Sequence, residues 1–142
     1  MTRAFALFLI LAAAPPVLAA DVVPPKDDLN GTWTAVSAER DGAAAGELLG
    51  NHIEFDGDRF RIVKGDNLLF GGRFTTDPDN TPAEIDFSVE DGLAKGQDWA
   101  GIYKIENDAL TVCDNAPDPS AARPQDFAAP TGSGHVCLSF ER

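Results

Sequence analysis

From residue 29 onward, apolar and polar residues alternate over short segments, with no long helical period between them. Successive residues of a strand point to opposite faces, so this alternation predicts half-buried strands. Eight strands are predicted, at residues 31–40, 52–56, 59–64, 68–75, 84–90, 99–106, 109–113 and 135–141. Residues 43–50, "AAAGELLG", predict instead a short helix or a capped loop after the first strand.

Most of the connections between these segments are short and rich in Gly, Asn and Asp, which accept the positive φ that tight hairpins require. Examples are "DGD" at 56–58, "KGDN" at 64–67 and "END" at 106–108. Each strand offers one apolar face, and tight hairpins join consecutive strands. A single closed sheet fits this pattern better than a sandwich with long crossovers. The prediction is an all-β fold, an eight-stranded up-and-down antiparallel barrel.

The three long connections are expected at one end of this barrel. They cover residues 41–51, 91–98 and 114–134, and they follow the first, fifth and seventh strands. In an up-and-down barrel, odd-numbered connections share one end and even-numbered ones share the other. The loop-rich end is therefore the predicted mouth, where barrels of this size hold small ligands.

Five residues are predicted to line a small-molecule site at this mouth. Trp99 and Tyr103 share the inward phase of their strand, and Leu48 and Phe127 are loop residues that could cover the opening. Strict alternation from Trp33 also turns Glu39 inward, as a polar anchor. The alternative is a bulge in the first strand that turns Glu39 to solvent and brings Val36 inside.

The first twenty residues have the order of a secretory signal peptide. Arg3 precedes the apolar run "AFALFLILAAA", and small residues follow, with cleavage expected after Ala19 or Ala20. The apolar run is shorter than the roughly 20 residues that span a bilayer, which disfavours a membrane anchor. We therefore expect an exported protein, periplasmic or extracellular, with no membrane insertion after cleavage. A Pro-rich lead at 21–28 precedes one domain at 29–142.

The charge of the chain is strongly acidic and narrows the choice of partners. The net charge is −12, and it becomes −13 without the leader, with ten basic residues against 23 acidic ones. Such an excess repels phosphate backbones and anionic lipid. We therefore expect no nucleic acid and no membrane surface as partner.

The two cysteines, Cys113 and Cys137, fall on the polar side of their strands, beside the apolar Val112 and Leu138. If these strands are antiparallel neighbours, the two sulfurs can meet across the outer surface. In an exported chain this pattern favours a disulfide over two free thiols, which remain the alternative.

The first strand resembles the first sequence signature of the lipocalins. Gly31-Thr32-Trp33 matches its G-x-W, in which glycine lets the chain pass tightly under the barrel and tryptophan plugs the closed end. The resemblance implies that Arg142, at the end of the last strand, stacks on Trp33. The alternative is an ordinary core tryptophan and a solvated arginine. The signature Thr-Asp-Tyr of lipocalins is missing, and "IEND" stands in its place.

A longer resemblance covers nearly the whole domain. The segments "LNGTWTAVSAERDG", "FDGDRFRI", "GGRFTTDPDNTPAEIDF", "GLAKGQDWAGIYKIENDALTVC", "RPQDF" and "SGHVCLSF" look like a small exported lipocalin-like (calycin) domain family, abundant as paralogues in planctomycete bacteria. The resemblance implies a lipocalin-like barrel. It implies no activity, because the family's function is unknown.

No arrangement of residues in the sequence predicts catalysis, a metal or a cofactor. His52 and His135 lie at the ends of predicted strands, at positions that alternate with the apolar residues. No serine lies in the G-x-S-x-G pattern of a nucleophile elbow. The carboxylates of "DPDNTP" are explained by turn chemistry. Two non-enzymatic hypotheses are favoured over an enzyme: a module that binds a small apolar molecule, and a protein-interaction module with a filled core, no ligand and an unknown protein partner. The oligomeric state stays open.

Overall fold

A computed structural model of the chain describes residues 26–142. The predicted signal peptide and most of the Pro-rich lead lie outside the described residues. The elements are η1 (Lys26–Leu29), β1 (Gly31–Arg40), β2 (Ala43–Ala44), η2 (Gly46–Leu48), β3 (His52–Asp56), β4 (Arg59–Lys64), β5 (Asn67–Asp77), β6 (Glu84–Gly92), β7 (Asp98–Glu106), β8 (Ala109–Asp114) and β9 (Val136–Glu141).

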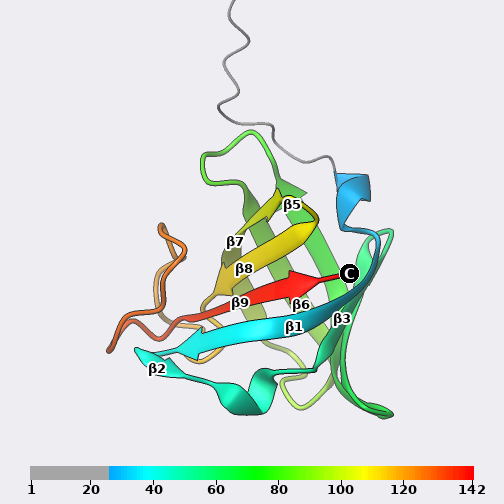
Figure 1. The fold of residues 1–142 in the computed structure, drawn as a ribbon, viewed down its shortest axis with the longest axis horizontal. Helices are drawn as coiled ribbons and strands as arrows, with labels where there is room; N and C mark the ends of the chain where they lie inside the picture. Colours follow the sequence, from blue (N-terminus) through cyan, green and yellow to red (C-terminus); the bar gives the residue numbers. More distant parts are fainter. Residues whose placement is uncertain (1–25) are drawn as a thin grey trace, which may run out of the picture.

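Eight of these strands form a closed antiparallel barrel (Figure 1). Strands β3 to β9 pair in chain order, and β1 pairs with both β3 and β9, so the sheet closes on itself. The predicted fold class is confirmed. The segment predicted as a short helix or capped loop forms the extra strand β2, which pairs with β1, and the 3₁₀ turn η2.

A bulge in β1 reverses the direction of the side chains that follow it. Ala35 pairs with Phe140 and Ser37 with Ser139, which leaves Val36 as the extra residue. Beyond the bulge, Arg40 pairs with Val136. The inward direction predicted for Glu39 from strict alternation is therefore wrong, and this residue is exposed. The alternative was right about the bulge, but Val36 is 46% exposed rather than inside.

One end of the barrel, which we term the closed end, is filled by side chains around Trp33. This indole is 0% exposed and donates from Nε1 to the carbonyl oxygen of Leu29 at 2.9 Å. The guanidinium carbon of Arg142 lies 4.2 Å from the ring centroid, and the same group donates to the carbonyl oxygen of Asn30 at 3.1 Å. Gly31 has a φ of +124°, a value that favours glycine. The chain thus crosses under the barrel here.

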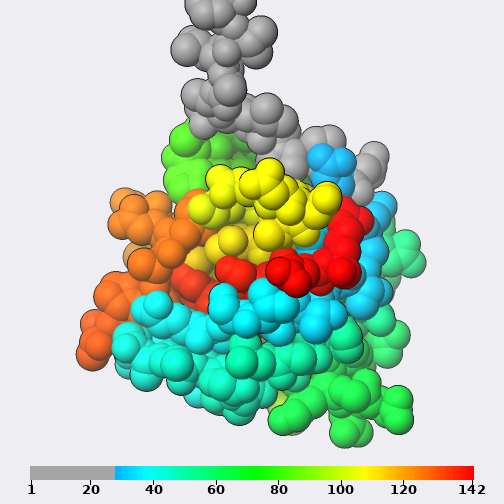
Figure 2. Space-filling view, viewed as in Figure 1, coloured from blue at the N-terminus to red at the C-terminus, as the bar shows by residue number. Residues whose placement is uncertain are grey.

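The long connection between β8 and β9 lies at the opposite end, coloured orange in Figures 1 and 2. It is ordered by its own polar contacts. Asn115 accepts from the backbone N–H of Ala100 at 2.8 Å and donates to the carbonyl oxygen of Ala121 at 2.9 Å. Arg123 binds the outside of the sheet, with a 2.7 Å ion pair to Asp86. The connection is therefore attached to the barrel wall.

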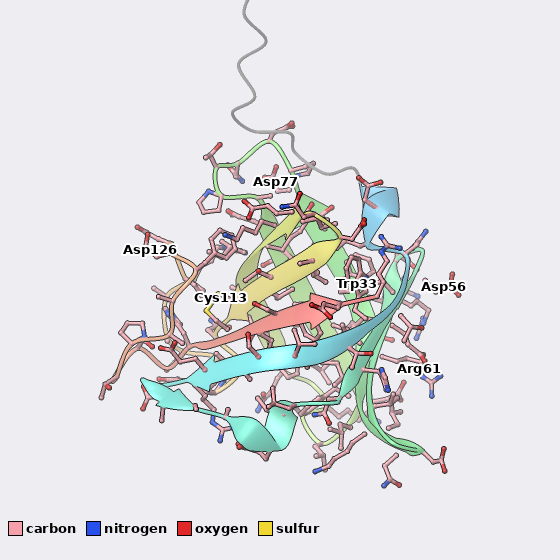
Figure 3. All side chains as sticks on the ribbon, in the orientation of Figure 1. Trp33, Asp56, Arg61, Asp77, Cys113 and Asp126 are labelled. Atoms are coloured by element: carbon pink, nitrogen blue, oxygen red, sulfur yellow. A yellow bond between two sulfur atoms is a disulfide. The ribbon has the colours of Figure 1, made fainter. Side chains whose placement is uncertain are left out.

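The disulfide joins Cys113 of β8 to Cys137 of β9. The two residues are direct register partners, and their Cα atoms are 4.1 Å apart. Cys113 is labelled in Figure 3, at the other end of the barrel wall from Trp33. The predicted pairing is present, and Cys113 is more buried than an outer-surface position suggested.

Thiol titration of the purified protein checks the disulfide. Under denaturing, non-reducing conditions we expect essentially no free thiol, because both cysteines are consumed by one bond. After reduction, two thiols per chain should appear. Two thiols before reduction would contradict the pairing.

Substitution of Trp33 measures the packing of the closed end. Trp33→Ala removes a fully buried aromatic side chain and is expected to lower the free energy of unfolding by about 3–5 kcal/mol. Arg142→Ala, which removes the stacked cation but leaves the core intact, should cost only about 1 kcal/mol. Denaturant unfolding of both variants gives the two values. An unchanged midpoint for Trp33→Ala would rule out the plug.

Candidate functional site

A cavity of about 280 Å³ occupies the end of the barrel interior opposite Trp33. Most of its walls are apolar side chains from seven of the barrel strands. They are Ile53, Ile62, Leu69, Phe70, Phe87, Trp99, Val112, Val136, Leu138 and Phe140. Each of the three long connections also contributes lining residues, among them Leu48, Ala94, Gln97, Ala116 and Pro117. The cavity therefore reaches the loop-rich end of the barrel, which we term the mouth.

Trp99 forms an ordered aromatic wall of this cavity. Its ring meets Phe70 edge to face with centroids 5.0 Å apart, and Phe87 at 6.1 Å. Its Nε1 donates to Oε1 of Gln97 at 3.2 Å. Because the polar atom of the indole is satisfied by its neighbour, the ring surface is free for apolar contact.

Asp114, the last residue of β8, places a carboxyl group in the lining of this apolar cavity. The residue is 7% exposed, and its Oδ1 accepts from the backbone N–H of Ala116 at 2.9 Å. Burial raises the pKa of the carboxyl to about 7, against the opposing effect of that hydrogen bond. Among the described residues, no basic side chain lies within ion-pair distance of Asp114.

The backbone around Asp114 depends on a glycine in the neighbouring strand. Gly101 of β7 is its register partner, and a Cβ built on Gly101 would lie 2.6 Å from the carbonyl oxygen of Cys113 and 2.9 Å from the Cβ of Asp114. Both distances are too short for ordinary contacts. Glycine therefore permits β7 and β8 to approach where the carboxyl is placed.

Two other ionisable side chains line the cavity, and each has its own partner. Arg40 lies in one row with Asp114, because both residues pair with Val136. Its guanidinium forms an ion pair with Glu47 of η2. His52 of β3 shares a 2.9 Å hydrogen bond between its Nδ1 and Oγ1 of Thr34.

The structure brings two of the five predicted ligand-binding residues together at the cavity, Trp99 and Leu48. Tyr103 does not line it. This residue is buried in the core, where burial raises the pKa of its phenol against the effect of a hydrogen bond with Thr76. Glu39 faces outward, for the reason given above. Phe127 does not line the cavity. Its ring packs against Lys104, whose Nζ lies 4.7 Å from the ring centroid.

Two ionisable residues of the cavity, Asp114 and Arg40, were not predicted from the sequence. For Asp114 a signal was present: extending the alternation of Leu110 and Val112 by one step turns it inward, but the predicted strand stopped at residue 113. For Arg40 the alternation of apolar and polar residues contains no such signal, because the direction of its side chain depends on the bulge at Val36.

Within residues 26–142, no three His, Cys, Asp or Glu side chains are grouped so that they could hold a metal ion. The same residues contain no helix with the length and apolar character needed to cross a bilayer. His135, the second histidine, has its Nε2 2.7 Å from the carbonyl oxygen of Ala122.

Fold and site together define a closed β-barrel with an apolar internal cavity and one buried carboxyl at its mouth. Comparisons of the chain with models of protein families, with curated proteins and with solved structures found no match.

The stability of the variant Asp114→Asn tests the burial of this carboxyl. The ordinary pKa is 3.8, so the folded protein holds the proton more tightly than the unfolded chain. The contribution of the protonated Asp114 carboxyl to the free energy of unfolding is present in full below about pH 4 and is lost as the pH rises through 7. At pH 8 we expect Asp114→Asn to be more stable than the parent by up to about 4 kcal/mol, with no difference below pH 4.

Denaturant unfolding at the two pH values measures this difference. Asp98→Asn is the matched control, because Asp98 begins β7 at the same end and is exposed. The control should change stability little at either pH. A lower stability of Asp114→Asn at pH 8 would contradict the assignment.

Proposed function

We propose that this chain is an exported, lipocalin-like binding protein that holds a small apolar molecule in the barrel. The observation that carries the proposal is the cavity of about 280 Å³, lined mainly by apolar side chains and reaching the mouth. Packed protein interiors rarely leave spaces much larger than a water molecule, so a hollow of this size is unusual for a domain that only folds.

The size of the cavity limits the ligand. Cavities for drug-sized ligands begin at about 300 Å³, and an apolar cavity of about 150 Å³ holds benzene. A molecule with one ring and a short chain, or with two fused rings, matches the volume. The edge-to-face arrangement of Trp99 and Phe70 offers such a ring an aromatic surface.

Two features support export as part of this proposal. The leader has the order of a signal peptide, and the disulfide Cys113–Cys137 is typical of an oxidising compartment. The resemblance of the sequence segments to an exported lipocalin-like family would imply the same compartment. We assign no catalytic role to the cavity.

The interaction module with a filled core has less support from the geometry. Large aromatic side chains fill the closed end, where Phe55 and Phe74 meet at 4.8 Å. At the mouth the inward positions include shorter side chains such as Val112 and Val136 beside the aromatic wall of Trp99, and the space described remains between them.

Titration with the neutral apolar dye 1-aminonaphthalene, whose two fused rings match the cavity volume, tests the binding function. We expect saturable binding with a rise in dye fluorescence. Val112→Phe adds a ring at an inward position and should weaken binding by about tenfold or more, because the added ring occupies the ligand's space. Thr111→Phe adds the same ring one residue away, at an outward position, and should bind the dye as the parent does.

Circular dichroism of both variants checks that the barrel remains folded. Equal dye affinity in Val112→Phe and Thr111→Phe would place the dye outside the cavity. If the parent binds no apolar probe, the interaction module is the better description.

A further inference from the structure

The buried carboxyl of Asp114 is the feature of the cavity that an apolar ligand alone leaves unexplained. A carboxylate taken out of water needs a hydrogen-bond donor or an opposite charge. The backbone N–H of Ala116 satisfies Oδ1 only. Since the side chain lines the cavity, its second oxygen is placed to accept a hydrogen bond from a bound molecule.

We propose that the cavity takes a cationic amphiphile, a molecule with an apolar body and a protonated amine at one end, and that this amine pairs with the carboxylate of Asp114. This inference rests on the proposed binding function and names the class of ligand.

The other charges at the mouth favour an amine over a carboxylate in the ligand. Arg40 is the basic group in the lining, and its guanidinium is already paired with Glu47. A ligand carboxylate would compete with Glu47 for this guanidinium, and it would bring a like charge toward Asp114. An ammonium group neither competes with Glu47 for the guanidinium nor brings a like charge toward Asp114. The acidic surface, with a net charge of −13 without the leader, also attracts cations.

The ligand's affinity should depend on pH through Asp114, because only the ionised carboxyl pairs with an ammonium group. The pKa of about 7 in the free protein places the loss of affinity below neutral pH. The elements packed around Asp114 carry other ionisable groups that have partners of their own: Arg40 with Glu47, His52 with Thr34, Asp118 with Ser120, Arg123 with Glu84 and Asp86, and His135 near the carbonyl oxygen of Ala122.

Calorimetry with three probes of one shape tests the proposal: 3-phenylpropylamine, 3-phenylpropanol and 3-phenylpropanoate. At pH 8 we expect the amine to bind about tenfold more tightly than the alcohol, and the carboxylate most weakly. At pH 5.5 the amine should lose about tenfold or more of its affinity, while the alcohol keeps its own. The amine is protonated at both pH values, so the change reports the protein.

Variants assign the effect to Asp114. Asp114→Asn should bind amine and alcohol with similar affinity at both pH values and should still bind the neutral dye. Asp98→Asn removes one acidic charge outside the cavity and should keep the preference for the amine. His135→Gln, which removes an imidazole outside the cavity lining, should keep both the preference and its pH dependence.

The outcomes separate this inference from the proposed function. If the parent binds the dye but shows no preference for the amine at pH 8, the carboxylate pairing is overturned and the binding function stands. A preference for the carboxylate would assign the ligand's head group to Arg40 instead. Failure of the dye and of all three probes to bind would overturn both proposals. The pH series on the parent protein decides the question even if Asp114→Asn does not fold.

Discussion

The pairing of β1 with β9 is the constraint on which the rest of the structure depends. Closure removes both edges of the sheet and encloses one interior, so every inward side chain must share that space. At one end Trp33, Phe55 and Phe74 fill it, and Arg142 covers the indole from outside the core. At the other end Trp99 and Phe70 form one wall, and shorter side chains such as Val112 and Val136 stand beside them and leave a cavity. The distribution of side-chain volume along the barrel thus determines where a ligand has room.

The same closure explains why the bulge at Val36 matters for the site. Without the extra residue, the alternation that points Trp33 and Ala35 inward would also turn Glu39 inward. With it, Arg40 takes the inward position beside Val136, and Glu39 joins Cys137 on the outer face. One inserted residue therefore determines which charge the mouth receives.

The fold was predictable from the sequence because alternation and turn chemistry are local signals. The strands at 31–40, 52–56 and 59–64 have the predicted bounds, and the position of the mouth followed from the order of the connections. The site was less predictable. Strict alternation gave the wrong direction for Glu39, and the bulge weighed as its alternative is what turns this residue to solvent. The long connection has no period at all, and Phe127 was expected over the mouth but lies against Lys104. Asp114 was not predicted as an inward residue, because the predicted strand at 109–113 ended one residue before it.

The position of Asp114 is costly for a protein that only has to fold. Its burial keeps the proton on the carboxyl at pH values where the unfolded chain would release it, so the folded state loses stability as the pH rises. An Asn could accept the same hydrogen bond from Ala116 without that loss. Groups that destabilise the fold gather at functional sites, since a ligand can supply the missing partner. An ammonium group in the cavity would do so, and the free energy lost in folding would be recovered on binding.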